Sequence, residues 1–299
     1  MSESNHPVIV AAGVSKRAIA EVVAVALEGR AWSQRRRCSS VVSLEEDNDV
    51  DVEDDWVLAQ SSSSSSNTND NNPVAGAARL SPRHVRGLVA RLLREDHHQA
   101  EAAVDRLLEM KLHESANRHV VRAAFDDTNI CEYLIQFMNR PGHHPQSVRL
   151  QSKCCGLLAN LTFRHEANTW KCHAVGACTR IVHAMTRFPR HLELQRCACA
   201  ALRNLSWYES HHHPVIAAGG IEAVIHALSE FPENDDIQTF GCRVLQRLIT
   251  NKNGSSESRT AVVTKGGVVA LAQAYERSYQ RGDPCESVAA EALHDLFGN

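Results

Sequence analysis

A short phrase with apolar ends recurs along this chain at a nearly constant interval. LLANL ends at Leu161, ALRNL at Leu205 and VLQRL at Leu248, so the intervals are 44 and 43 residues. AVDRL at 103–107 and ALHDL at 292–296 fit the same frame. Self-similarity at a period of about 20–50 residues is the signature of repeat architectures, in which each unit packs mainly on its neighbours. The chain is therefore expected to form a solenoid.

Each unit is expected to contain three helices. A second phrase recurs in step with the first, as HAVGACTRIVHAMTRFP at 173–189, IAAGGIEAVIHALSEFP at 216–232 and VVTKGGVVALAQAYERS at 262–278. Its glycines permit a sharp turn after a short first helix. A second helix of about ten residues follows, with apolar residues at helical spacing, and it ends near Phe-Pro because proline cannot continue a helix. The third helix carries a stripe of Ala, Cys and Leu.

These units resemble the armadillo repeat, a three-helix unit of about 42 residues. The matching residues are the Gly-Gly turn, the L-x-x-L-like second helix and the third-helix sequence ACAALRNL at 198–205. The resemblance covers the chain from about Arg79 to Asn299, where SPRHVRGLVARLL at 81–93 supplies a second helix. It implies an all-α fold, a right-handed superhelical, armadillo-like α-solenoid. Repeats of the HEAT type are the main alternative.

The composition changes sharply before the repeats begin. The stretch after residue 32 contains three arginines at 35–37, the acidic run EEDNDVDVEDD at 45–55 and six serines at 61–66. Such a sequence cannot bury enough apolar surface to offset its conformational entropy, so 33–77 is predicted to be a disordered acidic and Ser-rich linker. Residues 78–299 then form the repeat domain of four to five units. Residues 1–32 imitate two helices of one unit and are expected to dock as a cap.

Composition and charge exclude several classes of protein. The net charge of −3 combines an acidic head, with 6 Lys/Arg against 12 Asp/Glu in residues 1–74, and a mildly basic body, with 26 against 23. That excess is far below the one expected of a nucleic-acid binder. No apolar run approaches the roughly 18 residues of a membrane span, and no signal peptide is recognised. We therefore expect a cytoplasmic or nuclear protein whose ten cysteines are reduced thiols.

The cysteines follow the repeat rather than a metal-binding pattern. Cys155, Cys199 and Cys242 each lie six residues before the closing leucine of a third helix. A cysteine repeated in register is expected to fill the same small slot between helices as a compact hydrophobe. Neighbouring cysteines on one helix point in different directions, so CC and CAC do not supply the convergent ligands that zinc needs. No metal or other cofactor is predicted, although a metal-binding or redox-sensing protein is the alternative function.

The histidines are expected to be exposed. The clusters at 97–98, 143–144 and 211–213 fall where the repeat frame places loops or helix starts. His183 and His226 share one slot of the second helix, where the neighbouring units have Gln136 and Gln273, and solvated surface is the expected environment. The chain has no nucleophile elbow, no phosphate-binding loop and no H-E-x-x-H, so we do not expect an enzyme.

The resemblance places a binding face on the third helices. In armadillo proteins these helices line a concave groove, where an Asn one residue before the closing leucine holds an extended peptide by its backbone. The resemblance implies this role for Asn160 and Asn204, with Arg106, Arg247 and Asp295 at the equivalent positions of the neighbouring units. Importin-type grooves also place a Trp four residues earlier. This chain has Gly156, Ala200 and Arg243 there, which argues against nuclear-import cargo.

The same face carries positive residues. Helical spacing puts Lys153, Arg196, Arg243 and Arg247 on or near it, so the groove is expected to be moderately basic. We therefore predict a scaffold or adaptor that binds an extended or acidic peptide of a protein partner, without a small-molecule substrate. The acidic run at 45–55 is expected to occupy the groove when no partner is present. Ser39, Ser40 and Ser43 are candidate phosphorylation sites that would tune this docking.

Overall fold

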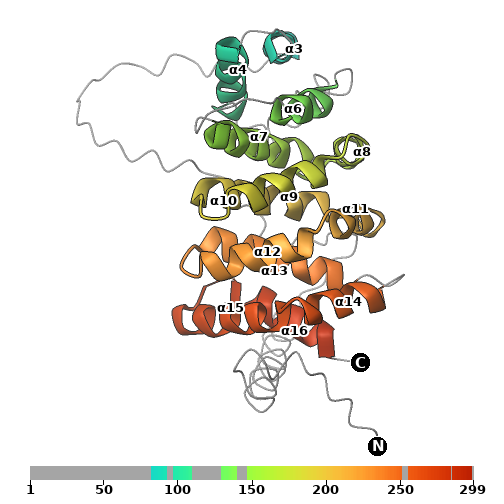
Figure 1. Cartoon of the computed structure of the whole chain (residues 1–299), viewed down its shortest axis with the longest axis vertical. Coiled ribbons are helices and arrows are strands. Elements are labelled where there is room, and N and C mark those ends of the chain that lie inside the picture. The colour runs from blue at the N-terminus through green and yellow to red at the C-terminus, as the bar shows by residue number, and fades with distance from the viewer. Residues whose placement is uncertain are drawn as a thin grey trace, which may run out of the picture.

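The computed structural model of the protein describes residues 82–92, 97–109, 129–139, 147–250, 255–283 and 285–297 (Figure 1). Within these ranges the chain forms helices and turns and has no strand. The predicted cap at 1–32 and the predicted linker at 33–77 lie outside the described residues, as do Ser39, Ser40 and Ser43. None of the described helices is both long and apolar enough to cross a membrane.

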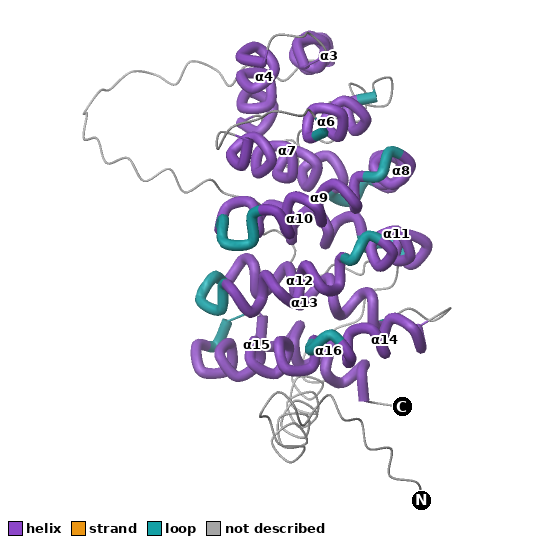
Figure 2. Tube along the Cα trace, in the orientation of Figure 1, coloured by secondary structure: helices purple, strands orange, loops and turns teal. Residues whose placement is uncertain are grey.

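The helices fall into the three positions that the repeat predicts. Third helices are α4 (His97–Glu109), α7 (Ser147–Thr162), α10 (Leu192–Leu205), α13 (Asp235–Ile249) and α16 (Cys285–Phe297). Second helices are α3 (Pro82–Leu92), α6 (Ile130–Met138), α9 (Ala177–Arg187), α12 (Gly220–Glu230) and α15 (Gly267–Arg281). First helices are α8 (Glu166–Ala174), α11 (His212–Ala217), which follows the short 3₁₀ turn η1 (Glu209–His211), and α14 (Ser255–Thr264). They follow one another along the long axis, from α3 and α4 at one end to α15 and α16 at the other (Figure 2).

The third helices form a continuous layer. Helix α7 packs between α4 and α10, and α13 packs between α10 and α16. The closing leucines of the period, Leu161, Leu205 and Leu248, are fully buried in this layer, where each contributes about 1.5–3 kcal/mol relative to an exposed side chain. The cysteine prediction is confirmed, because Cys155, Cys199 and Cys242 are all completely buried. Burial raises the pKa of the Cys199 thiol to about 12, as expected for a packing residue.

The Gly-Gly turn between first and second helices is required by two different constraints. Gly219 adopts a left-handed backbone with φ of 80°, a region that residues with a Cβ rarely adopt. Gly220 has ordinary helical geometry, but a Cβ there would lie 2.7 Å from the carbonyl oxygen of Val215. The first glycine therefore allows the turn, and the second allows α12 to approach the end of α11. The equivalent of Gly220 in the preceding unit is Ala177, which is fully buried.

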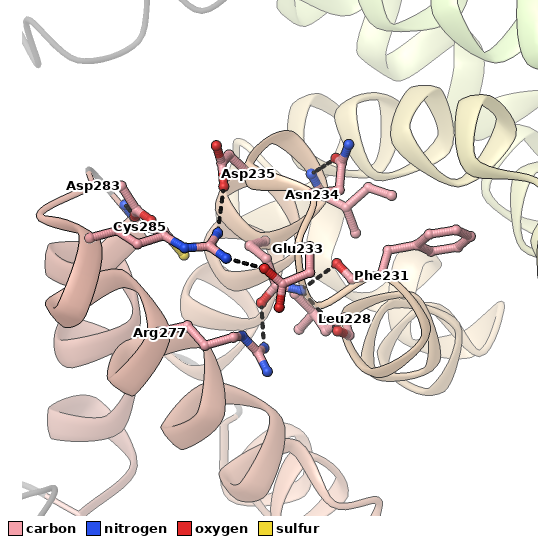
Figure 3. A network of polar contacts seen from close by, with 11 residues as sticks. Leu228, Phe231, Glu233, Asn234, Asp235, Arg277, Asp283 and Cys285 are labelled. Carbon is pink, nitrogen blue, oxygen red and sulfur yellow. Dashed lines mark hydrogen bonds and ion pairs between the residues drawn. The ribbon is translucent and has the colours of Figure 1, made fainter.

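A glutamine of the following third helix fastens the ends of the second helices α9 and α12. The Nε2 amide of Gln195 donates to the carbonyls of Met185 and Phe188, at 2.9 and 3.1 Å. One unit later, Gln238 donates in the same way to Leu228 and Phe231, at 2.8 and 3.0 Å (Figure 3). The last four carbonyls of a helix have no partner within that helix. These amides therefore satisfy groups that would otherwise be buried without a hydrogen bond.

Two glycine substitutions distinguish the effect of the left-handed turn on stability from the effect of glycine's low helix propensity. Gly219→Ala is expected to lower the free energy of unfolding by about 1–2 kcal/mol, because alanine must adopt the left-handed backbone. Gly87→Ala lies in α3 with no heavy atom within 4 Å of the added Cβ, so it is expected to raise stability by about 0.5–1 kcal/mol. Urea denaturation of both variants measures the difference. Equal effects would contradict the assigned role of Gly219.

Candidate functional site

The predicted peptide-binding column is partly occupied by the chain itself. Asn204 is only 3% exposed, and its Nδ2 donates to the carbonyl oxygen of Ala159 at 2.7 Å. Ala159 belongs to the last turn of α7, so Asn204 fastens α10 to the preceding third helix. Arg247 repeats the contact one unit later, where its Nη1 donates to the Arg203 carbonyl at 2.6 Å. Both side chains therefore cap the C-terminal end of the third helix before their own.

The remaining members of the column differ from these two. Asn160 is partly exposed, and its side-chain amide has no recorded hydrogen bond to any residue that the structure describes. Arg106 is exposed and forms an ion pair with Glu109 on the same helix, at 2.7 Å. Asp295 is partly buried beside His294, at 3.3 Å. Of the two asparagines, Asn160 is thus the one whose amide remains available to an incoming peptide.

Three of the predicted basic residues are neutralised by carboxylates. Lys153 on α7 contacts Asp105 on α4 at 2.9 Å. Arg196 pairs with Glu193 on its own helix at 2.8 Å and with Asp236 on α13 at 3.3 Å. Arg243 lies 3.9 Å from Glu291 on α16. These pairs tie adjacent third helices together. The positive charge predicted for this face is therefore largely compensated, and a role of these residues in partner binding stays a prediction.

The slots that hold Trp in importin-type grooves are packed between helices here. A Cβ on Gly156 would lie 3.5 Å from the Cys197 sulfur and 3.6 Å from a methyl of Leu108. Ala200 is 3% exposed. Neither position has room for an indole without moving a neighbouring third helix, which agrees with the prediction against an importin-type array.

Arg164, Trp207 and Arg247 form a cluster that the repeat pattern did not predict, and we name it the Arg–Trp corner. The guanidinium carbon of Arg247 lies 4.1 Å from the centre of the Trp207 ring, and that of Arg164 lies 6.0 Å from it. Both arginines lie where third helices end, as Trp207 does. The sequence contains one indication of this cluster. NLTF at 160–163 and NLSW at 204–207 each place an aromatic residue two positions after a closing leucine.

The histidine cluster at 211–213 is not the exposed loop that the sequence predicted. His211 is fully buried, and it contacts the rings of Trp170, His173 and Tyr208 at centroid distances of 4.4, 4.7 and 5.3 Å. His212 is also buried, and His213 is exposed. The repeat frame located the junction correctly, but periodicity does not reveal that first helices of adjacent units meet there.

Two of these histidines satisfy backbone carbonyls. His173 Nε2 lies 3.0 Å from the Leu205 carbonyl and His212 Nε2 lies 3.1 Å from the Ser206 carbonyl, so each nitrogen must carry the proton and donate. His211 has no hydrogen-bond partner on either ring nitrogen among the described residues. His183 and His226 are exposed, as predicted.

The thiols and histidines do not converge on a metal ion. Among the residues that the structure describes, no group of three or more His, Cys, Asp or Glu has the geometry to hold one. Cys131 and Cys172 form one pair of neighbouring thiols, with sulfurs 2.8 Å apart. The hydrogen bond to Cys131 and burial raise the pKa of Cys172 well above its usual value, which disfavours the reactive thiolate.

The buried histidines predict a loss of stability in acid. Burial lowers the pKa of His173, His211 and His212 below the ordinary value of about 6.5. The unfolded chain therefore binds more protons than the folded one as the pH falls below about 6.5. Stability contributed by the neutral histidines is complete above that pH and is lost as the pH falls towards their folded pKa values.

His211→Leu tests this prediction, because leucine fills the aromatic surroundings without titrating. We expect the fall in melting temperature between pH 7.5 and pH 5.5 to be smaller in this variant than in the unmodified protein. His213→Leu, at the exposed neighbour, should leave the fall unchanged. Identical pH profiles for all three proteins would contradict a role for His211.

Comparison with known proteins gives one family match and several structural matches. Residues 170–280 match the family model of the LRRK2 ARM repeat. No curated protein matches the sequence. An engineered protein, structural genomics target OR329, aligns with a TM-score of 0.57 and 21% identity over 71% of this chain and 79% of its own. A second, target OR366, aligns with a TM-score of 0.52 and 18% identity over 72% of this chain and 99% of its own.

These identities are below 25%, so the structural matches show the fold alone. The family model shows in addition that residues 170–280 are similar in sequence to ARM repeats. This range contains the helices from α9 to α14 and most of α15, with the glycine turns and two complete third helices. The described part of the chain has an armadillo-like α-solenoid fold, as the sequence resemblance predicted.

Proposed function

We propose that the protein is a protein-interaction module that holds an extended peptide segment of a partner against the C-terminal ends of its third helices. Armadillo-type repeats generally mediate protein–protein contacts, which supports the broad assignment. The more specific assignment, binding of an extended peptide, is supported by the side chain of Asn160. It presents an amide without a recorded partner among the described residues, in a column where Asn204 and Arg247 are already engaged.

An amide suits this role because it offers both a donor and an acceptor, as a peptide group does. One such hydrogen bond contributes only about 1 kcal/mol net, so useful affinity requires further contacts. Arginines on α7 and directly after it supply them in this proposal. Arg164 lies four residues further along the chain and is exposed, and Arg149 is exposed near the start of α7.

We further propose that the partner segment is acidic and that the chain's own run at 45–55 competes with it. The run carries eight carboxylates and is tethered to the repeat domain. A tethered ligand acts at a high effective concentration, so even a weak contact would be populated. In this scheme the protein is a scaffold without catalytic activity, placed in the cytoplasm or nucleus.

Substitution of the two asparagines should have different effects, one on peptide binding and the other on the free energy of unfolding. Asn160→Ala is expected to weaken peptide binding about fivefold while leaving the melting temperature nearly unchanged, because the amide holds no recorded structural contact. Asn204→Ala leaves the Ala159 carbonyl without its donor in a buried site and should cost about 1–3 kcal/mol of unfolding free energy. Peptide titration and urea denaturation of both variants measure the two effects. A large stability loss for Asn160→Ala would contradict the assignment.

Competition by the acidic run is tested in the full chain. All eight carboxylates at 45–55 are changed to the matching amides, which gives a neutralised chain of the same length. A fluorescein-labelled peptide with the sequence of residues 44–56 is then titrated by anisotropy into both proteins. We expect the neutralised chain to bind this peptide at least tenfold more tightly, because its own run no longer competes.

The matched control is the same peptide with every carboxylate replaced by an amide, which should bind weakly to both proteins. Equal affinity of the two proteins for the acidic peptide would rule out competition by the tethered run. Failure of the acidic peptide to bind either protein would rule out the acidic partner.

A further inference from the structure

The Arg–Trp corner brings two positive charges, the exposed Arg164 and the half-buried Arg247, to one half-buried indole. Arg247 from α13 and Arg164 from the end of α7 both lie within 6.0 Å of the Trp207 ring centre, and Arg164 also lies 5.5 Å from the ring centre of Phe163. A guanidinium beside an indole is attracted by the ring face and is held in a defined plane. The corner therefore positions its donors before any ligand arrives.

Arg164 differs in its pairing from three other basic residues of this layer. Lys153, Arg196 and Arg243 each contact a carboxylate of the chain. For Arg164, which is exposed, no ion pair or hydrogen bond of the side chain to another described residue is recorded. Its guanidinium keeps donors in the fork geometry that matches a carboxylate. The charge of Arg164 is thus not compensated by any carboxylate within the described ranges.

The backbone at Arg164 supports a role beyond packing. Its φ of 48° is the single left-handed value among the described residues other than glycine. For a residue with a Cβ this conformation costs about 1–2 kcal/mol. Strained backbone of this kind gathers at binding sites, where it aims a side chain in a direction that regular structure would not allow.

We propose that the Arg–Trp corner binds a carboxylate side chain of an extended acidic peptide, and that its occupant is the chain's own acidic run at 45–55. This deepens the proposed function, on which it rests, by naming the anchor of the acidic segment. A carboxylate beside Arg164 accepts charge-assisted hydrogen bonds from the exposed guanidinium while the peptide backbone runs past the Asn160 amide. Arg247, whose Nη1 already donates to the Arg203 carbonyl, adds positive charge on the other side of Trp207. The two arginines thereby select an acidic segment, which a single neutral amide cannot do.

The length of the tether permits this contact. The chain has 26 residues between Asp55 and Pro82, where α3 begins, and an extended chain spans at most about 3.4 Å per residue, or about 90 Å in total. Helices that pack against each other have axes about 8–10 Å apart, so α10 lies only two such steps from α4 in the third-helix layer. The run therefore reaches the corner without strain.

The test uses the neutralised full chain, in which the site is open to an added peptide. Arg164→Gly removes the guanidinium and retains the left-handed backbone, which glycine adopts readily. Arg187→Ala is the matched control, because Arg187 is also exposed and its guanidinium lies 5.3 Å from the ring centre of an adjacent aromatic residue, Phe188, but on a second helix. Binding of the labelled 44–56 peptide is measured by anisotropy for each variant.

We expect Arg164→Gly to weaken binding about tenfold and to reduce the salt dependence of the affinity, because one charge-assisted contact is lost. Arg187→Ala should change the affinity less than twofold. Arg164→Asn, which also tolerates the left-handed backbone, should behave as the glycine variant does and guards against a folding defect peculiar to glycine.

If both Arg164 variants bind the acidic peptide as tightly as Arg187→Ala does, the corner is not the anchor, and the proposed function stands with another site. If the neutralised chain without further substitutions fails to bind the peptide, both proposals fall together. If the Arg164 variants bind the acidic peptide and its all-amide version with equally reduced affinity, the corner does not bind a carboxylate, and the proposal is wrong.

Discussion

The carbonyl groups at the C-terminal ends of the helices must be satisfied, and this requirement organises the polar residues of the solenoid. Each α-helix ends with four carbonyls that lack a partner within the helix, and a buried one left unpaired costs about 1–3 kcal/mol. Third helices are capped from neighbouring elements by Asn204, Arg247, His173 and His212. Second helices are capped by Gln195 and Gln238. These hydrogen bonds cross from one helix to another, so the same contacts that satisfy the backbone also fix how the units stack.

This use of polar side chains limits where a partner can bind. Positions that the family resemblance assigns to peptide recognition are already occupied at Asn204 and Arg247, and the cations Lys153 and Arg196 already face carboxylates. The third-helix layer is consequently closed over much of its length. Asn160 and Arg164 lie at the C-terminal end of α7, and Trp207 follows α10. There the Asn160 amide and the exposed Arg164 guanidinium keep capacity for hydrogen bonds and charge.

The sequence predicted the fold well because its constraints are local and repeated. Gly219 marks a left-handed turn that residues with a Cβ rarely adopt, and Cys199 appears in register because its position is completely buried. Residue identity at one position therefore reports the backbone or the packing at that position.

The candidate site was less predictable because its properties depend on contacts between units. No local pattern shows that Asn204 reaches Ala159, that Asp105 neutralises Lys153, or that His211 is buried by Trp170. The Arg–Trp corner depends on a left-handed residue after α7 and on an arginine two third helices away. The aromatic residue after two of the closing leucines is visible in the sequence, in NLTF and NLSW.

In the proposed function, partner binding concentrates at the ends of α7 and α10 and is not spread along the third-helix layer. Amide hydrogen exchange of the neutralised full chain, with and without the 44–56 peptide, tests it directly. On peptide binding we expect slower amide hydrogen exchange at residues 160–165 and 204–208, with little change in the second helices α9 and α12. Protection spread evenly over α4, α7, α10, α13 and α16, or confined to the second helices, would contradict it.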